Sequence, residues 1–355
     1  MLKHALRDAF RIDRSGSQAR ASVPCTIAIA LSLFGGMWAG RPELGLVAAG
    51  GAMCVGFGAF QALGGSRTAP MFWASAGMSV AAAVGSLAPH TASGLLFHAA
   101  IIGFVYGLLT VLGPGAAWIT LQCGIFALVA TAYPTGLKDA LARALLVLAG
   151  GWLQMIVVLL FRQLHSHFNA AAAYEDAFSG VLPALRTLRE NLRWQSPEFR
   201  FGLKLAATLG VAAVSAYYLG LSNGYWVPMT ALFVLRTELR ETFSRGVARV
   251  AGTLVGAGLA TLLASGLRPG PVAVGALVVF FAWLCYSVVN VNYGVFSVCV
   301  TAYIAFLLAF GGLPEKEVVL HRVANTALGG AIALAVAIPE LLAPRSRRST
   351  AVRVS

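Results

Sequence analysis

The chain has 355 residues, of which 58% are hydrophobic and only 11% are charged, and its mean hydropathy is +0.78. A soluble domain carries about 25% charged residues, so this composition excludes a soluble enzyme and indicates an integral membrane protein. The net charge of +13 comes from basic residues that flank apolar segments and form no stripe along a polar domain, which argues against nucleic-acid binding.

Apolar segments long enough to cross a bilayer follow one another along the chain. A membrane-spanning helix needs about 20 residues, because the hydrocarbon core is about 30 Å thick. We therefore expect an all-α integral membrane protein with about twelve transmembrane helices. The expected spans are residues 23–39, 44–64, 70–88, 93–112, 115–132, 140–162, 200–220, 225–237, 246–266, 270–289, 293–311 and 319–342.

The long polar stretch after the sixth span divides the chain into four expected parts. These are a first six-helix membrane repeat with a polar N-terminal segment (1–162), a helical cytoplasmic linker (163–199), a second six-helix repeat (200–342) and a basic tail (343–355). Most lysines and arginines fall in alternate connections, which the positive-inside rule assigns to the cytoplasm. We expect a multi-pass protein of the bacterial inner membrane with both termini cytoplasmic.

One pattern indicates that the second half duplicates the first. Arg143 is followed seven residues later by Gly150 and Gly151, and Arg322 is followed seven later by Gly329 and Gly330. Two halves with an even number of spans have the same orientation, so the pattern predicts parallel repeats with a pathway between them. Chance similarity between two glycine- and alanine-rich helices is the alternative.

The eighth expected span is too short to cross a membrane. Its apolar part runs from Trp226 to Leu235, about half the length that a crossing needs. Short or broken helices mark binding sites in transporters, so the arginines that follow, Arg236 and Arg240, are candidate anion-binding residues on one helix face. The alternative is an ordinary cytoplasmic loop whose arginines set the topology. Tyr225 and Trp226 are expected first as interfacial anchors.

Among the ionisable residues inside expected spans, Arg249, Arg322 and His98 are candidate functional residues, because a charge there is costly and usually functional. Arg249 lies near the start of the ninth span and Arg322 in the last, and each either lines an anion path or extends to the membrane surface. His98 lies in the fourth span, where it either carries a proton or hydrogen-bonds a backbone carbonyl group.

Other chemistry is not supported by the sequence. No Walker-type glycine-lysine motif occurs, and the cysteines and histidines lack the spacing of metal ligands, so we expect no nucleotide site, cofactor or metal. All 13 acidic residues fall at span ends or in connections, so a pump with a central carboxylate is not indicated. Glu238 is the best acidic candidate for proton coupling.

The second half resembles the FUSC family of fusaric acid resistance proteins and aromatic carboxylic acid exporters, over residues 200–340. The carrying residues are Arg200-Phe201, Gly224-Tyr-Trp-Val-Pro-Met-Thr230, Glu238 to Thr242, Arg245, Arg249-Val-Ala-Gly-Thr-Leu-Val-Gly256, and Arg322 with Asn325, Thr326 and Gly329. The family pattern has aspartate where Glu238 and Asn325 stand. The second of these differences removes a charge that could pair with Arg322.

The resemblance implies export across the inner membrane, and a periplasmic adaptor protein as a partner in some assemblies. Plant aluminium-activated malate transporters are distantly similar, with one six-helix unit per subunit in a dimer. The likeness implies that this chain is such a dimer fused into one polypeptide. Its own oligomeric state stays open.

Together these observations predict an exporter of organic anions, with aromatic or amphipathic carboxylates as substrates. Arg236, Arg240, Arg249 and Arg322 would attract the carboxylate, and Tyr225 and Trp226 would stack against the substrate. Glu238 and His98 are the candidates for proton coupling. A passive anion channel and a non-transporting membrane scaffold or efflux-assembly partner are the alternatives.

Overall fold

A computed structural model describes residues 13–165, 180–312 and 315–338, and all helices named here lie in these ranges. The first half contains α2 (Val23–Trp38), α3 (Pro42–Gly56), α4 (Ala69–Ser86), α5 (Ala92–Leu109), α6 (Pro114–Ala130) and α7 (Leu137–His165). After α9 (Val181–Asn191), the second half contains α10 (Pro197–Tyr218), α11 (Trp226–Val234), α12 (Leu239–Leu267), α13 (Pro271–Val288), α14 (Tyr293–Phe310) and α15 (Glu315–Ala337). Short 3-10 turns extend α3 (Phe57–Phe60) and α5 (Thr110–Leu112).

The sequence marks many of the helix starts. Proline occupies the first or second position of α2, α3, α4, α6, α10 and α13, where its missing N–H leaves no hydrogen bond unmade. Side-chain oxygens cap three starts: those of Thr91, Ser196 and Asn292 accept hydrogen bonds from backbone N–H groups in the first turns of α5, α10 and α14. Most helices therefore begin within a few residues of the expected positions.

Eight of the described helical segments are long and apolar enough to cross a membrane, which confirms a multi-pass membrane protein. They are α3, α5, α7, α10, α12, α13, α14 and α15, with α3 and α5 extended by their 3-10 turns. Helices α2 and α6 are apolar but have only 16 and 17 residues, and α11 has nine. Twelve crossings therefore remain a prediction.

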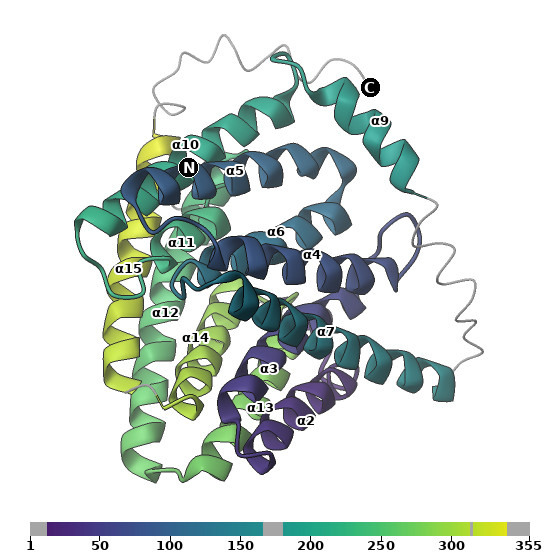
Figure 1. The fold of residues 1–355 in the computed structure, drawn as a ribbon, viewed down its shortest axis with the longest axis vertical. Coiled ribbons are helices and arrows are strands. Elements are labelled where there is room, and N and C mark those ends of the chain that lie inside the picture. The colour runs from purple at the N-terminus through teal and green to yellow at the C-terminus, as the bar shows by residue number, and fades with distance from the viewer. Residues whose placement is uncertain (1–12, 166–179, 313–314, 339–355) are drawn as a thin grey trace.

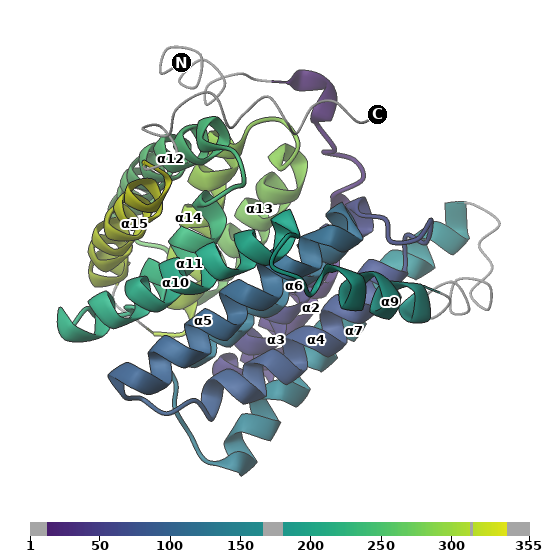
Figure 2. The same ribbon diagram turned by 90° about the horizontal axis from the view of Figure 1, so that it is seen from above.

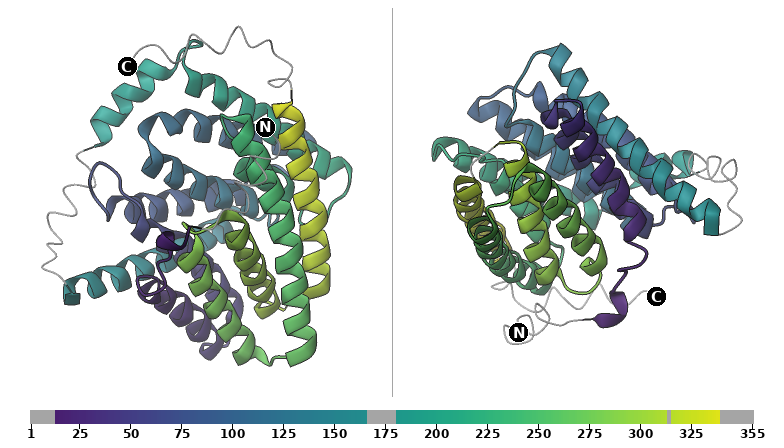
Figure 3. Two further views of the ribbon diagram at one scale, coloured as in Figure 1. Left: turned by 180° about the vertical axis from the view of Figure 1, so that it is seen from behind. Right: turned by 90° about the horizontal axis from the view of Figure 1, so that it is seen from below.

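The helices run in two main directions (Figure 1). Helices α4, α5, α6 and α10 run across the view, whereas α12, α14 and α15 lie along its vertical axis. Seen from above, α5, α6 and α10 again run alongside one another (Figure 2). The views from behind and below show α12 and α15 side by side at one edge of the molecule (Figure 3). Helix α12 therefore belongs to a layer formed by the second half.

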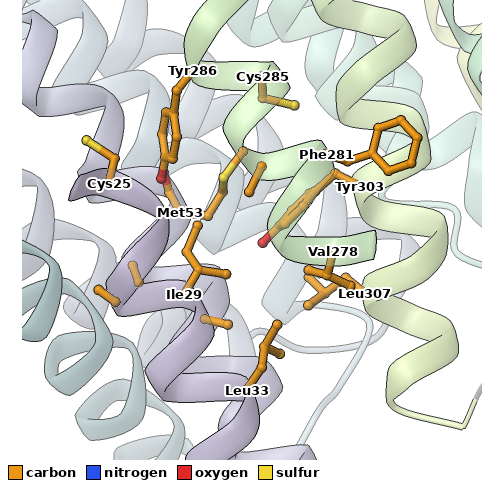
Figure 4. Packing of buried hydrophobic residues seen from close by; sticks show 14 of the residues in the cluster. Cys25, Ile29, Leu33, Met53, Val278, Phe281, Cys285, Tyr286, Tyr303 and Leu307 are labelled. Atoms are coloured by element: carbon orange, nitrogen blue, oxygen red, sulfur yellow. The ribbon is translucent and has the colours of Figure 1, made fainter. Parts of the chain in front are cut away.

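The two halves meet mainly through two helix pairs. Helix α10 packs along α5, and α2 packs against α13. Figure 4 shows the second contact, where Ile29 and Leu33 of α2 face the helices that carry Val278 and Leu307. Beside this contact, the Tyr286 hydroxyl group of α13 donates a 2.8 Å hydrogen bond to the carbonyl oxygen of Met53 in α3. The junction is thus a continuous apolar core and not a polar channel at this point.

The structure corrects one detail of the expected second half. Helix α11 ends at Val234, and α12 begins already at Leu239, not at residue 246 as expected. Arg236 therefore lies in the break between two helices and does not share a helix face with Arg240. In the expected helical linker, α9 starts directly after Gly180 and has Pro183 in its first turn. Residues 166–179 of the linker, residues 1–12 and the tail lie outside the described residues.

Candidate functional site

Two arginine side chains are buried inside the second half. Arg249 of α12 is 2% exposed and Arg322 of α15 is 1% exposed, and these two helices pack against each other. The two positive charges are close enough to repel one another. None of the three guanidinium nitrogens of Arg322 has a hydrogen-bond partner in the described protein, and neither does Nε of Arg249.

An unpaired buried charge is expensive, at several kcal/mol, unless an opposite charge compensates it. No aspartate or glutamate whose side chain the structure describes is buried, so the described part of the chain supplies no such charge at this depth. The arginine pair is therefore a strong electrostatic attractor for an anion.

Aromatic rings cover both guanidinium groups. The guanidinium carbon of Arg322 lies 3.9 Å from the ring centroid of Trp226, and that of Arg249 lies 4.8 Å from the ring of Phe233. Such cation–π contacts are each worth about 0.5–2 kcal/mol and orient the cation without neutralising it. Tyr225 lies beside Trp226, with ring centroids 5.2 Å apart.

The expectation that Tyr225 and Trp226 are interfacial anchors is wrong, because they are only 8% and 5% exposed. Helix α11 is short and begins at Trp226, so its first residues are enclosed by the longer helices α10 and α15 that pack against it. A ring in that position faces protein and not the lipid headgroups.

Hydroxyl groups on four positions add to the polar interior of the second half. Buried threonine and serine hydroxyl oxygens without a hydrogen-bond partner in the described protein belong to Thr230 of α11, Thr253 of α12, Ser297 of α14 and Thr326 of α15. Buried polar groups are nearly always hydrogen-bonded, so this concentration of free donors is unusual. These hydroxyl groups were not among the site residues expected from the sequence. The available signal was their spacing, since Thr253 and Thr326 each follow a buried arginine by one helical turn.

Glycine lets these helices approach closely enough to gather the polar groups. A methyl group on Gly329 of α15 would collide with the carbonyl oxygen of Val227 and lie 2.8 Å from Cβ of Thr230. One on Gly252 of α12 would lie 2.5 Å from Cβ of Ser297. Small residues of this kind allow close helix packing in membrane proteins.

A cavity of about 370 Å³ opens beside the site, between the two halves. Helices α5, α6, α10 and α11 with their connections line it, and Tyr225, Asn223 and His98 are among its walls. The Asn325 side chain donates to the carbonyl oxygens of Ser222 and Asn223 at 2.9 and 3.1 Å, which ties the α10–α11 connection to α15. Tyr225 and this connection therefore lie between the cavity and the arginine pair.

His98 does not have the surroundings of a dedicated proton carrier. Its Nε2 atom lies 3.2 Å from the carbonyl oxygen of Ala127, which matches the alternative of a histidine bonded to the backbone. The ring nevertheless lines the cavity, so it can contact a solute there.

The remaining sequence candidates lie toward the break between α11 and α12. Arg236 is half-buried and donates to the Tyr106 hydroxyl group at 3.1 Å, so it bridges the two halves. Arg245, which is close enough to Arg236 to repel it, lies over the Tyr293 ring at 5.0 Å. Arg240 and Glu238 are exposed. The structure thus brings Arg249, Arg322, Tyr225 and Trp226 together and places the other candidates elsewhere.

Metal binding has no support in the described ranges, where no three histidine, cysteine, aspartate or glutamate side chains gather as a metal site would need. All five cysteines are free thiols. The chemistry available at the site is therefore that of arginines, hydroxyl groups and aromatic rings.

Comparison with known proteins confirms the family resemblance. Residues 211–336 match the family described as fusaric acid resistance protein-like. This match covers α11 to α15 and therefore the whole arginine site. No solved structure matches the chain.

Curated relatives are similar over less than half of the chain. The inner membrane protein YccS of Escherichia coli is 30% identical over 164 residues, which cover 45% of this chain and 22% of that protein. An uncharacterized transporter of Salmonella typhimurium, YdhK, is 29% identical over 136 residues, covering 36% of this chain and 19% of its own length. An uncharacterized protein of Synechocystis is 29% identical over 175 residues, covering 49% of this chain and 23% of its own. The chain therefore spans under a quarter of the length of these relatives.

Proposed function

We propose that the protein exports organic anions across the bacterial inner membrane, with aromatic or amphipathic carboxylates as substrates. The observation that carries the proposal is the Arg322 guanidinium group, which is buried, covered on one face by Trp226 and without a hydrogen-bond partner in the described protein. The similarity to an inner membrane protein and to a transporter supports the setting.

The geometry suits a carboxylate with an apolar body. A planar guanidinium group binds a carboxylate through two parallel hydrogen bonds. The aromatic rings of Trp226 and Tyr225 give an aromatic substrate a stacking surface next to the charge. The hydroxyl groups of Thr230 and Thr326 can donate to remaining carboxylate oxygens. The cavity between the halves gives the substrate access.

Passive movement of the anion is the second candidate function. The lack of a buried carboxylate among the described residues favours it over proton-coupled transport. No described aspartate or glutamate is buried, and Glu238 is exposed. Export of an anion needs no proton, because the inside-negative membrane potential drives one charge outward with about 2.3 kcal/mol per 100 mV. A channel or a voltage-driven carrier would therefore suffice.

We also propose that the two halves are six-helix repeats, and the packing pairs support this. In each half the first helix packs on the second, the second on the sixth, and the third on both the fifth and the sixth. The contacts between halves also correspond, since α10 on α5 and α2 on α13 each join a first helix to the other half's fourth. We further propose that both termini are cytoplasmic and that a periplasmic adaptor protein is a partner.

The test is counterflow in proteoliposomes loaded with unlabelled aromatic carboxylates. Wild type should exchange labelled benzoate saturably, and Arg249→Ala and Arg322→Ala should not, although both reach the membrane. Arg189→Ala, in the exposed part of α9, is the matched control that should retain exchange. Folded protein that exchanges no anion would favour the scaffold alternative.

A further inference from the structure

We infer that the chain has a single anion site, enclosed within the second half, and that the first half repeats its helices without repeating the site. This inference rests on the proposed function, and it adds the number and the position of the sites. Residues at equivalent positions of the two halves support the inference. Close contacts at glycines show which positions are equivalent, and these contacts do not depend on the chemistry of the side chains at the site.

The second and sixth helices of each half correspond through one such contact. A methyl group on Gly150 of α7 would collide with the carbonyl oxygen of Ala48 in α3. A methyl group on Gly329 of α15 would collide in the same way with that of Val227 in α11. In the sequence, Gly329 follows Gly150 by the same number of residues as Val227 follows Ala48. Both partners of the contact are thus shifted equally, which fixes the alignment of α3 with α11 and of α7 with α15.

The third and fifth helices correspond through a second contact. Gly85 of α4 closely approaches the carbonyl oxygen of Ala127 in α6, and Gly256 of α12 approaches that of Val298 in α14. Along the sequence, Gly256 follows Gly85 by the same number of residues as Val298 follows Ala127. This number is slightly smaller than the number of residues that separates equivalent positions of α7 and α15. This contact therefore aligns α4 with α12 and α6 with α14.

The contacts between the halves repeat as well. Gly103 of α5 meets the backbone of Leu205 in α10, and Gly275 of α13 meets the ring of Phe34 in α2. In the sequence, the number of residues between Gly103 and Gly275 differs by only one from the number between Phe34 and Leu205. The fourth helix of each half therefore meets the first helix of the other half at nearly equivalent positions, as a pseudo-two-fold relation requires.

These alignments show what the first half has in place of the site. Apolar residues stand at the positions equivalent to four site residues: Val47 for Trp226, Met78 for Arg249, Ala82 for Thr253 and Val147 for Thr326. Met78, Ala82 and Val147 are at most 1% exposed and lie in the apolar interior. Neither a charge nor a hydroxyl group is available at these positions to hold an anion.

The equivalent arginine is also engaged differently. Arg143 corresponds to Arg322, but it is only half-buried and donates to the carbonyl oxygen of Tyr133 at 2.8 Å and to the Ser86 hydroxyl group. Its Nη1 atom therefore has protein partners in the α6–α7 connection and at the end of α4. Arg322 has no such partner in the described chain. The arginine common to both halves has a structural role in one and is free for a ligand in the other.

It follows that a substrate passes through the second half and not along the part of the junction where α2 and α13 form an apolar contact. The cavity between the halves is then an access chamber to one site, and a chain binds one substrate at a time. A fused pair of identical subunits would instead bind two.

The test compares the equivalent variants Thr326→Cys and Val147→Cys, each in full-length protein whose five cysteines are replaced by alanine. The probe is the anionic reagent 2-sulfonatoethyl methanethiosulfonate. The introduced thiolate attacks the sulfenyl sulfur, a mixed disulfide forms, methanesulfinate leaves and the thiol proton goes to the buffer. We expect modification of Thr326→Cys, and no modification of Val147→Cys in the time that completes the first reaction. A cationic reagent of the same length should modify neither.

Equal modification of both variants, or modification of Val147→Cys alone, would overturn the inference, and so would two unreactive cysteines. Benzoate separates this result from the proposed substrate class. Protection of Thr326→Cys by benzoate supports both, whereas modification without protection supports the single site and contradicts the carboxylate assignment. Should the cysteine-free protein not fold, counterflow of Arg143→Met and Arg322→Met gives the same comparison. There, only the second variant should lose exchange, and a loss in both would contradict the single site.

Discussion

The guanidinium carbon of Arg322 lies 3.9 Å from the ring centroid of Trp226, and none of the three guanidinium nitrogens has a hydrogen-bond partner in the described protein. The ring covers one face of the cation and leaves its N–H groups, which lie in the plane of the guanidinium group, free to bind in other directions. An arginine that served packing or topology alone would have protein partners for its donors, as Nη1 of Arg143 does in the Tyr133 carbonyl oxygen and the Ser86 hydroxyl group. The pair therefore has the form of a ligand site.

Replacement of Arg322 by lysine should restore little of the function lost in Arg322→Ala. An ammonium group keeps the charge, but it cannot form the two parallel bonds to a carboxylate or lie flat on Trp226. Both variants should lose most benzoate counterflow at equal amounts of protein in the membrane. Full activity of Arg322→Lys would show that only the net charge matters, and would contradict two-point binding.

Replacement of Trp226 should weaken benzoate binding, and the loss should be smaller when the new side chain keeps an aromatic ring. Removal of a desolvated cation–π contact costs about 1–2 kcal/mol, or roughly a five- to thirtyfold weaker binding. Trp226→Leu should therefore raise the benzoate concentration that gives half-maximal exchange by this factor, and Trp226→Phe should raise it less. Equal effects of leucine and phenylalanine would show that the ring only fills space.

Close helix contacts at equivalent glycines should make both halves sensitive to a single methyl group. Gly329→Ala and Gly150→Ala should each destabilise the protein by roughly 1–3 kcal/mol, because the added methyl group meets backbone atoms that cannot move aside easily. Gly258→Ala, where nothing lies within 4 Å, is the control and should not destabilise. Thermal unfolding in detergent measures all three. A neutral Gly150→Ala would contradict the equivalence of the two contacts.

Transport should follow voltage and not the pH gradient. Since no described carboxylate is buried, a potassium diffusion potential should drive benzoate across proteoliposome membranes. Collapse of an imposed pH gradient should leave the flux unchanged, as should Glu238→Gln. Stimulation by a pH gradient that disappears in Glu238→Gln or His98→Gln would identify proton coupling through these residues.

The positions of the helices could be predicted from the sequence, because apolar length, proline at helix starts and glycine or polar connections are local signals. The shortness of α11 was also predictable, since only a short apolar stretch follows Tyr225 before the first arginine. Arg249 and Arg322 were recognised because an arginine inside an apolar span is costly wherever it lies.

What the sequence did not reveal depends on packing between helices that are distant along the chain. The burial of Trp226 follows from the contacts of α11 with α10 and α15, which no local pattern records. The separation of Arg236 from Arg240 depends on a break of a few residues whose position is not fixed by hydropathy. The hydroxyl group of Ser297 joins the site only because Gly252 lets α12 approach α14.

The most direct test of the central claim is to locate a bound anion by its anomalous scattering. Crystals of the full chain grown with 4-bromobenzoate should give a bromine peak inside the second half, among α11, α12 and α15, with the carboxylate directed to Arg322. The account predicts one such peak per chain. A peak confined to the junction of the two halves, or a second peak of equal height beside Arg143, would contradict it.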